Sequence, residues 1–445
     1  MRYVLALMLA AASLSAQTVT FNKQIAPIIF NNCSECHRPG EAAPFSLLSY
    51  QDVMKKGAII AAVTTSRQMP PWKAEPASYK YRDERRLKDS DIALIQAWVK
   101  QGMPEGLASD RPAPPKFTSG WRLGEPDLIV EMPAAYHIPA DGPDIYRNIA
   151  LPLGLPDDKW ITAIEMRPTA RTVVHHVLYF ADPAGKVHEK TDGSEPGFPG
   201  MQAGGASVPL GGWAVGAQPH FYPEGLAMHV PKGSDLVMQY HFHPSGKPEA
   251  EKSVIGLYFA KQAPARTMVA LQLPPTYSLF SGLDIPAGEK DFVIRDSYTL
   301  PVAVDAVGAS AHAHYIAKQM TMTATFPTGE VKTLLKIGDW DFSWQDRFYF
   351  QDFVALPKGT RLDTEIHWDN SAQNPHNPSS PPIRVTWGEQ SKDEMGSVTL
   401  ITVPHEESEL RILQVDTRKR RSDVAREAMM SNPALAAKVQ ALMAQ

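Results

Sequence analysis

The spacing of apolar residues predicts helices near the start of the chain. Two stripes of apolar side chains have the spacing of one helix face. The first is Ile25, Ile28 and Ile29, and the second is Ile92, Ile95, Trp98 and Val99. Asp89-Ser90-Asp91 would begin the second helix and Gly102 would end it. Helix is also expected over 52–62. Together these segments predict a small all-α domain over residues 17–106.

From about residue 127 the pattern changes to short runs in which apolar and polar residues alternate. Examples are the runs 160–166, 253–259 and 319–326, which are divided by turns rich in proline and glycine. Alternation with period two is typical of half-buried strands. The length of this part favours two antiparallel β-sandwiches of jelly-roll type, which we place at 125–260 and 261–405.

The remaining segments have simpler patterns. Residues 1–16 have a basic start, an apolar stretch and small residues at the end, which predicts a secretory signal rather than a buried N-terminal helix. Residues 107–124 contain Pro112-Ala113-Pro114-Pro115 and are expected to be a stiff linker. Residues 406–445 form a helical tail whose basic cluster, Arg418-Lys419-Arg420-Arg421, is either a solvated face or a docking site. The mature protein should be periplasmic or secreted.

The composition excludes some classes of function. The 445 residues have a formal net charge of −4, so no basic field favours nucleic acid as a partner. After the signal, no stretch is apolar enough to predict a membrane span. The 39 prolines and 29 glycines favour short strands and turns over long helices.

Both cysteines of the chain lie in one motif, Cys33-Ser34-Glu35-Cys36-His37. C-x-x-C-H is the attachment signature of one covalent c-type haem, in which the thiols hold the macrocycle and the histidine reaches the iron. Met69 is the expected sixth iron ligand, with Met54 as its rival. A zinc site or a redox dithiol would need a second cysteine pair or a βαβ pattern. The helical domain is therefore expected to be a cytochrome c domain.

Histidines recur at strand spacing in Ala311-His312-Ala313-His314. Residues i and i+2 of a strand point to the same face, so His312 and His314 could chelate a transition metal. The alternative is that they are polar positions of a half-buried strand. Met395 is a candidate third ligand, and its soft thioether would favour Cu(I) over zinc.

A second set of histidines lies in the predicted first sandwich. His175 and His176 are adjacent, so on a flat strand they would face opposite ways, one into the core and one outward. For both to bind one metal, the strand would have to twist or the rings turn inward through Nδ1. His241 and His243 lie downstream and share a face.

The order His-His, Gln-x-His, His-x-His and Asp-Glu-Met over about residues 125–405 resembles the type II copper, ascorbate-dependent monooxygenases. These are the peptidylglycine α-hydroxylating and dopamine β-monooxygenases. The resemblance implies two coppers, one for electron transfer and one for oxygen, separated by a solvent gap between the sandwiches. It implies the ligands His175, His176 and His241 for the first copper, and His312, His314 and Met395 for the second.

This chain differs from the animal enzymes in several ways. No disulfide is possible in the sandwiches, because both cysteines lie at the N-terminus. Ser310 stands where the amidating enzyme has a substrate-binding arginine, and Ser397 and Thr399 stand at other substrate contacts, which argues against a peptidylglycine substrate. The resemblance assigns no role to five further histidines, which are His220, His229, His243, His367 and His376.

The sequence thus predicts a haem- and copper-dependent monooxygenase that hydroxylates a C–H bond of a small organic substrate with O₂. Electrons would enter through the haem from a periplasmic donor or an ascorbate-like reductant. A non-catalytic haem and copper electron-transfer protein is the main alternative, and a zinc hydrolase is a weaker one. A blue-copper site is excluded, because it needs a thiolate and both thiols belong to the haem motif.

Overall fold

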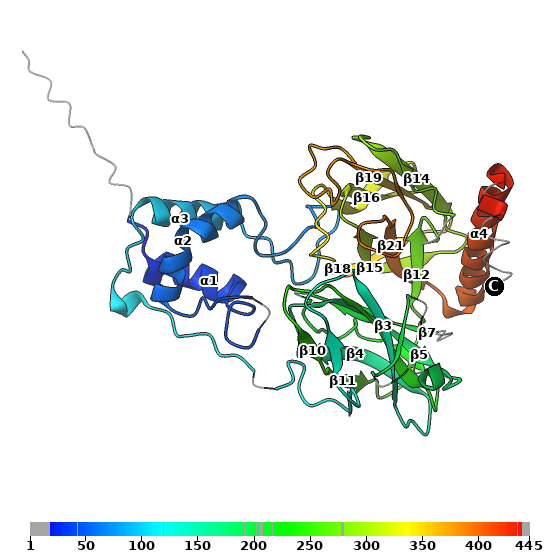
Figure 1. The fold of residues 1–445 in the computed structure, drawn as a ribbon, viewed down its shortest axis with the longest axis horizontal. Helices are drawn as coiled ribbons and strands as arrows, with labels where there is room; N and C mark the ends of the chain where they lie inside the picture. The colour runs from blue at the N-terminus through cyan, green and yellow to red at the C-terminus, as the bar shows by residue number, and fades with distance from the viewer. Residues whose placement is uncertain are drawn as a thin grey trace, which may run out of the picture. The chain divides into compact units, whose positions relative to one another are not determined.

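The computed structural model describes residues 18–41, 43–118, 120–190, 193, 195–201, 203, 208–215, 217–276, 280–433 and 435–437. The predicted signal at 1–16 lies outside them. The chain forms two compact units (Figure 1). The first ends at Pro71 and resumes over Arg85–Phe117, and the second comprises Trp72–Glu84 and the residues from Thr118 onward. The predicted boundaries at 106, 124, 260 and 405 stay predictions.

The N-terminal unit contains short helices around one apolar core. They are the π-helix η1 (Phe21–Ile25), α1 (Ala26–Asn32), α2 (Tyr50–Thr65), α3 (Asp89–Lys100) and the short 3-10 helix η2 (Ala108–Asp110). The Ser49 hydroxyl accepts a hydrogen bond from the Asp52 N–H and so caps α2. Ile25, Ile29, Ile95 and Trp98 are fully buried, which explains the two apolar stripes.

The predicted fold class, an all-α cytochrome c domain followed by two sandwiches, is wrong. The protein is mostly β, with 19% of residues helical, and its longest helix is α4 (Leu410–Ser431) near the C-terminus. The helices α1, α2 and α3 have only 7, 16 and 12 residues, and long irregular segments join them. Moreover, Trp72–Glu84, inside the predicted domain, packs with the β unit, where Tyr81 forms a bridge with Phe350. Helical periodicity located the helices but could not show that this segment leaves their core.

The first group of strands forms a five-stranded sheet, β6-β3-β9-β5-β7, and a four-stranded sheet, β1-β11-β4-β8, with a small β10-β2 ribbon. The strands are β1 (Leu128–Glu131), β2 (Tyr136–Ile138), β3 (Ile145–Pro152), β4 (Lys159–Arg167), β5 (Val174–Asp182), β6 (Phe198–Pro199), β7 (Val208–Ala214), β8 (Met228–Val230), β9 (Asp235–Phe242), β10 (Glu249–Glu251) and β11 (Val254–Phe259). A short 3-10 helix, η3 (Val187–Lys190), follows β5. Apolar residues of both larger sheets share one core, so these sheets form a sandwich.

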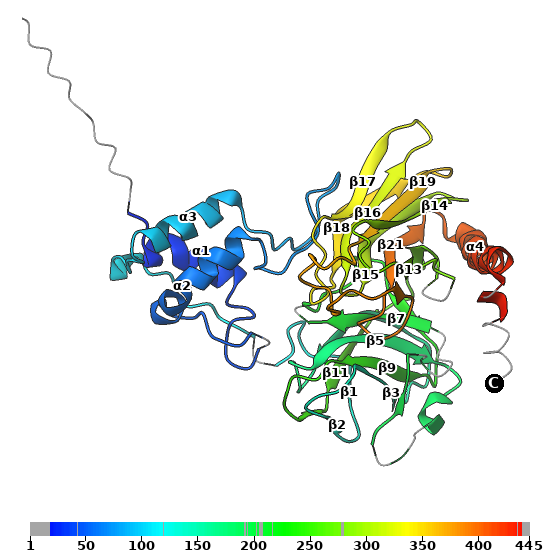
Figure 2. The same cartoon turned by 45° about the horizontal axis from the view of Figure 1, so that its top comes forward.

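The second group of strands forms the sheets β12-β21-β15-β18 and β14-β19-β16-β17, with a small β13-β20 ribbon. The strands are β12 (Val269–Leu273), β13 (Asp284–Ile285), β14 (Phe292–Thr299), β15 (Val304–Ala313), β16 (Ala317–Thr325), β17 (Val331–Ile337), β18 (Arg347–Leu356), β19 (Arg361–Trp368), β20 (Val385–Thr386) and β21 (Gly396–Pro404). These sheets also share a core and form a second sandwich. Strands β5 and β7 of the first sandwich lie close to β15 of the second (Figure 2).

Two outer segments pack on the second sandwich. Trp72 and Tyr81 contact Phe348 with ring centroids 5.0 and 5.7 Å away, and the Tyr81 hydroxyl donates to the Leu334 carbonyl at 2.7 Å. The 3-10 helix η4 (Glu407–Glu409) leads into α4, which buries Leu413 in the core. None of the described helices is long and apolar enough to cross a membrane.

Candidate metal centre

Strands β5 and β9 bring three imidazoles together. His175, His176 and His241 each offer a nitrogen, and these nitrogens lie within 4.8 Å of one another. The pairing of β5 with β9 shifts register between Val174 and His176. Such an irregularity turns a side chain out of the normal alternation, so both adjacent histidines face the same point. The split of one core and one surface histidine, expected on a flat strand, does not occur.

The ring nitrogens of this group suit a metal. His175 Nε2 donates to the backbone carbonyl of Phe342 at 3.0 Å, while His175 Nδ1 faces His176 Nδ1 at 3.0 Å. Burial, together with nearby imidazoles, lowers the pKa of His175 to about 3 and that of His176 well below its ordinary value. Both rings are therefore neutral near pH 7, the form in which histidine binds metals.

His241 completes the group in an unusual environment. Its side chain is 1% exposed, yet neither ring nitrogen makes a hydrogen bond. Nε2 lies 3.3 Å from Asp144 Oδ2, which is within ion-pair distance but lacks hydrogen-bond geometry. The ring stacks on Tyr146 with centroids 4.4 Å apart. Because buried polar atoms rarely remain without partners, these nitrogens fit a metal ligand.

The second predicted group lies at the end of β15. His312 is on the strand, His314 follows it by one residue, and Met395 directly precedes β21. His312 Nδ1 donates to Gln345 Oε1 at 2.6 Å, and His314 Nδ1 donates to the Asp393 carbonyl at 3.1 Å. Hydrogen bonds of this kind fix the orientation and tautomer of metal-binding imidazoles. Burial lowers the pKa of His312 to about 4 and that of His314 to about 3.

Glu394 joins the two parts of this second group. Its buried carboxylate accepts hydrogen bonds from the backbone N–H groups of His314, Ile316 and Met395 at 3.0, 2.9 and 3.0 Å, and from Trp368 Nε1 at 3.1 Å. Burial raises the pKa of Glu394 to about 8, although these four donors act in the opposite direction. The sequence analysis treated this residue only as the neighbour of Met395.

Asp144 joins the first group to the loop that carries Met395. Its carboxylate lies beside His241, accepts from His243 Nδ1 at 2.8 Å, and accepts from the backbone N–H and the hydroxyl of Ser391. Burial acts to raise the pKa of Asp144, but these hydrogen bonds outweigh it and hold the pKa well below its ordinary value. His243, which had no predicted role, thus contacts the residue that faces His241.

The two histidine groups are neighbours. The rings of His176 and His312 have centroids 6.2 Å apart, and the Phe342 ring stacks on His175 at 4.3 Å and lies 5.8 Å from His314. The resemblance implied a solvent gap between the two groups, which stays a prediction. The loop that carries Phe342, between β17 and β18, packs against a histidine of each group. No periodic pattern in the sequence marks that loop.

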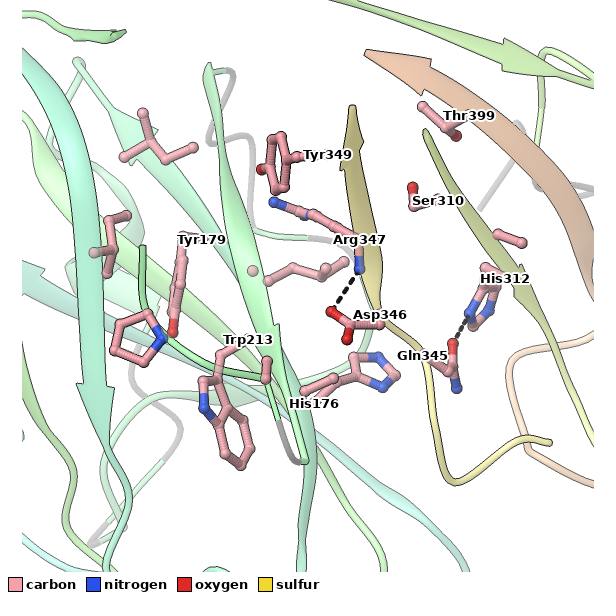
Figure 3. A pocket seen from close by; sticks show the side chains of 18 of the residues that line it. His176, Tyr179, Trp213, Ser310, His312, Gln345, Asp346, Arg347, Tyr349 and Thr399 are labelled. Carbon is pink, nitrogen blue, oxygen red and sulfur yellow. Dashed lines mark hydrogen bonds between the residues drawn. The ribbon is translucent and has the colours of Figure 1, made fainter. Parts of the chain in front are cut away.

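A cavity of about 370 Å³ borders both groups (Figure 3). His176 lines it from the first sandwich, and His312, His314 and Met395 line it from the second. Ser310 and Thr399, expected at substrate contacts, also line the cavity, whereas Ser397 is buried. His220, which had no predicted role, lines the cavity with its ring 4.6 Å from Tyr349. Of the others, His229 pairs with Asp158 and His367 with Asp291.

The N-terminal cysteine motif follows α1. Cys33 and Cys36 form no disulfide. Burial and the neighbouring Cys36 raise the pKa of Cys33 to about 12, unlike the lowered pKa of redox dithiols. His37 Nδ1 donates to the Phe45 carbonyl at 3.2 Å. Met69 lies in the turn after α2, where its N–H donates to the Val63 carbonyl at 3.1 Å. Met54 is on α2, and its competition with Met69 stays open.

Comparisons with known proteins agree in part with this site. No known family profile matches the sequence. DBH-like monooxygenase protein 1 of Gallus gallus is 25% identical over 210 residues, covering 43% of this chain and only 32% of the relative's length. This similarity is consistent with the copper monooxygenase family and with an oxidoreductase, and it identifies no substrate, reductant or haem.

Solved structures add no functional information. The major capsid protein P2 of bacteriophage PM2 aligns with 62% of this chain and 97% of its own, with a TM-score of 0.25 and 9% identity. An infectious bursal disease virus structure, strain Gx, aligns with 63% of this chain and 73% of its own, with a TM-score of 0.19 and 6% identity. Similarities this low carry no argument.

Proposed function

We propose that this chain is an exported copper monooxygenase that hydroxylates a C–H bond of a small organic molecule with O₂. The observation that carries the proposal is that two groups of histidines border one cavity between the two sandwiches. The second group has the thioether of Met395 beside it on the cavity wall. The partial similarity to a DBH-like monooxygenase supports the same class of reaction.

Each group has the donors that copper requires. His175, His176 and His241 would hold one ion through neutral imidazoles, and His312, His314 and Met395 would hold the other. Imidazoles suit both copper and zinc, but the Met395 thioether favours Cu(I). When bound, one copper would activate O₂ and the other would supply the second electron that a monooxygenase reaction needs.

The surrounding residues orient these donors and shape the reaction space. The Phe342 carbonyl, the Gln345 amide and the Asp393 carbonyl accept ring protons of His175, His312 and His314. These contacts leave the second nitrogen of each ring as the possible ligand. Apolar side chains on the cavity wall restrict water near the reacting groups.

We also propose that one haem is attached through Cys33 and Cys36 and delivers electrons singly. Two cysteines that form no disulfide, and the orientation of His37 by the Phe45 carbonyl, fit such a group. Met69 would be the sixth ligand. The electron source would be a periplasmic donor or an ascorbate-like reductant, in keeping with the predicted signal at 1–16. The alternative is a non-catalytic haem and copper electron-transfer protein.

The test of the proposed function is to replace the thioether side chain of Met395. Met395→Ile should retain the haem and the three-histidine copper but lose copper-dependent oxygen consumption. Met228→Ile, on β8 and outside the cavity lining, is the control for loss of a methionine. Unchanged oxygen consumption in Met395→Ile would favour the electron-transfer alternative.

A further inference from the structure

Arg347 lies beside the second histidine group, on the neighbouring strand. Arg347 of β18 is paired with Ser310 of β15, and Ser310 is paired on its other side with Thr399 of β21. Directly opposed residues of antiparallel strands point to the same face of the sheet. Arg347 therefore shares a face with Ser310 and with His312, and all of them line the cavity (Figure 3).

The first sandwich provides space for the Arg347 guanidinium. A Cβ on Gly211 would lie 2.8 Å from Arg347 Nη1, and a Cβ on Gly212 would lie 3.5 Å from Nη2. Gly211 also has a φ of +113°, which disfavours any other residue. Gly211 of β7 thus leaves the space that the guanidinium occupies, whereas 3.5 Å at Gly212 is an ordinary contact distance. Figure 3 shows this end of Arg347 beside Tyr349, while the Asp346 carboxylate accepts from the Arg347 backbone N–H at 2.8 Å.

The Arg347 guanidinium is hydrogen-bonded to the Tyr349 hydroxyl, and other tyrosine hydroxyls line the same cavity. Among the described residues, no carboxylate forms an ion pair with the Arg347 side chain. The Tyr179 hydroxyl is buried and has no hydrogen-bond partner, and it lines the same cavity. Burial raises the pKa of Tyr179 and Tyr222, so both hydroxyls stay protonated. The Asp346 carboxylate also lines the cavity, but it accepts from the Arg347 backbone N–H and forms no ion pair with the guanidinium. An anionic ligand would give this partly buried cation the ion pair that it lacks.

Much of the remaining cavity wall is apolar. It includes Ala163, Ile164, Leu178, Met201, Leu210 and Trp213. A matching ligand therefore has one anionic group and an apolar body. A carboxylate suits this position, because it carries one negative charge and its two oxygens can accept two parallel hydrogen bonds from one guanidinium.

We propose that Arg347 binds the carboxylate of a small organic acid. The identification of this acid as the hydroxylated substrate rests on the proposed function. Two residues along a strand span about 7 Å, so the acid would extend from Arg347 toward His312. Arg347 thus lies on β18, the strand next to the one that carries Ser310. In this proposal, Arg347 determines the specificity for an acid.

The test measures binding to the metal-free, full-length protein by titration calorimetry at pH 7.5. The probes are 3-phenylpropanoate, its uncharged amide and 3-phenylpropylamine, which share one apolar body. The acid should bind at least about tenfold more tightly than the other two, because it alone forms a charge-assisted pair. Arg347→Met should weaken acid binding about tenfold or more and leave amide binding unchanged.

Two further variants separate binding from folding. Arg295→Met removes an exposed arginine of β14 that pairs with Glu365, and it should leave acid binding unchanged. If Arg347→Met unfolds, Arg347→Lys decides the question, and it should bind the acid more weakly than the unmodified protein.

Three results would overturn the inference: tighter binding of the amine, equal binding of acid and amide, or acid binding unaffected by the cavity variants. Copper content is measured separately, on the same preparations after reconstitution. Acid binding without copper uptake would refute the proposed function alone. Copper uptake and oxygen consumption without acid binding would refute this inference alone.

Discussion

His175 donates a hydrogen bond from Nε2 to the backbone carbonyl of Phe342 at 3.0 Å, although the two residues belong to different sandwiches. The same carbonyl accepts from Gln345 Nε2 at 3.0 Å, and Gln345 Oε1 accepts from His312 Nδ1 at 2.6 Å. A continuous series of hydrogen bonds therefore joins the two histidine groups through one loop. This loop orients an imidazole of each group.

Gln345→Leu should weaken metal binding at the second group alone. The substitution removes the acceptor that fixes the His312 ring, and loss of such a partner typically costs 10–100-fold in metal affinity. Competition titration with a Cu(I) chelator would measure both affinities, with exposed Gln351→Leu on β18 as the control. Equal weakening of both sites, or of neither, would contradict this role.

Glu394→Ala should destabilise the second sandwich. Three backbone N–H groups and the Trp368 indole would lose their buried acceptor. Each buried donor left without a partner costs about 1–3 kcal/mol, so the free energy of unfolding should fall by about 3 kcal/mol or more. Urea denaturation measures this, with Glu330→Ala in an exposed turn as the control. A loss below about 1 kcal/mol would disagree with the observed contacts.

Asp144→Ala should loosen the loop before Met395. Asp144 is held between His241, His243 and Ser391, so its removal frees the Ser391 N–H and hydroxyl. Amide hydrogen exchange over 389–395 should become faster. Asp141→Ala, three residues away and exposed, should leave exchange there unchanged. Unaltered protection in Asp144→Ala would show that other contacts hold the loop.

The haem proposal makes two spectroscopic predictions. Cys36→Ser should lose covalently attached haem while retaining copper, as judged by denaturing electrophoresis with haem staining and by metal analysis. Met69→Ile should lower the haem reduction potential, because a thioether ligand raises it, while Met54→Ile should not. A lowered potential in Met54→Ile instead would assign the sixth ligand to Met54.

Strand and helix periodicity predicted much of the local structure. The stripe at Ile92, Ile95 and Trp98 is the buried face of α3, and the alternation over 319–326 is β16. Periodicity could not show that Trp72–Glu84 packs on the second sandwich, because that depends on aromatic contacts with residues such as Phe348. The predicted all-α cytochrome domain was wrong for this reason and because the helices are short.

The candidate site residues were selected through spacing and resemblance, which point to side chains able to bind a metal. The residues that orient them were missed. Phe342 and Gln345 lie in a loop without periodicity, and Arg347 is recognised only once its pairing with Ser310 is known. The adjacency of His175 and His176 argued against a shared site until the register shift in β5 was seen. Glu394 alone had a sequence signal, its position directly before Met395.

The most direct test of the central claim is metal analysis of the copper-reconstituted, full-length protein by mass spectrometry. The account predicts two coppers per haem iron. His175→Ala and His312→Ala should each reduce this to one, because each variant disrupts a different group. Bound zinc in place of copper, or copper at neither histidine group, would contradict the account.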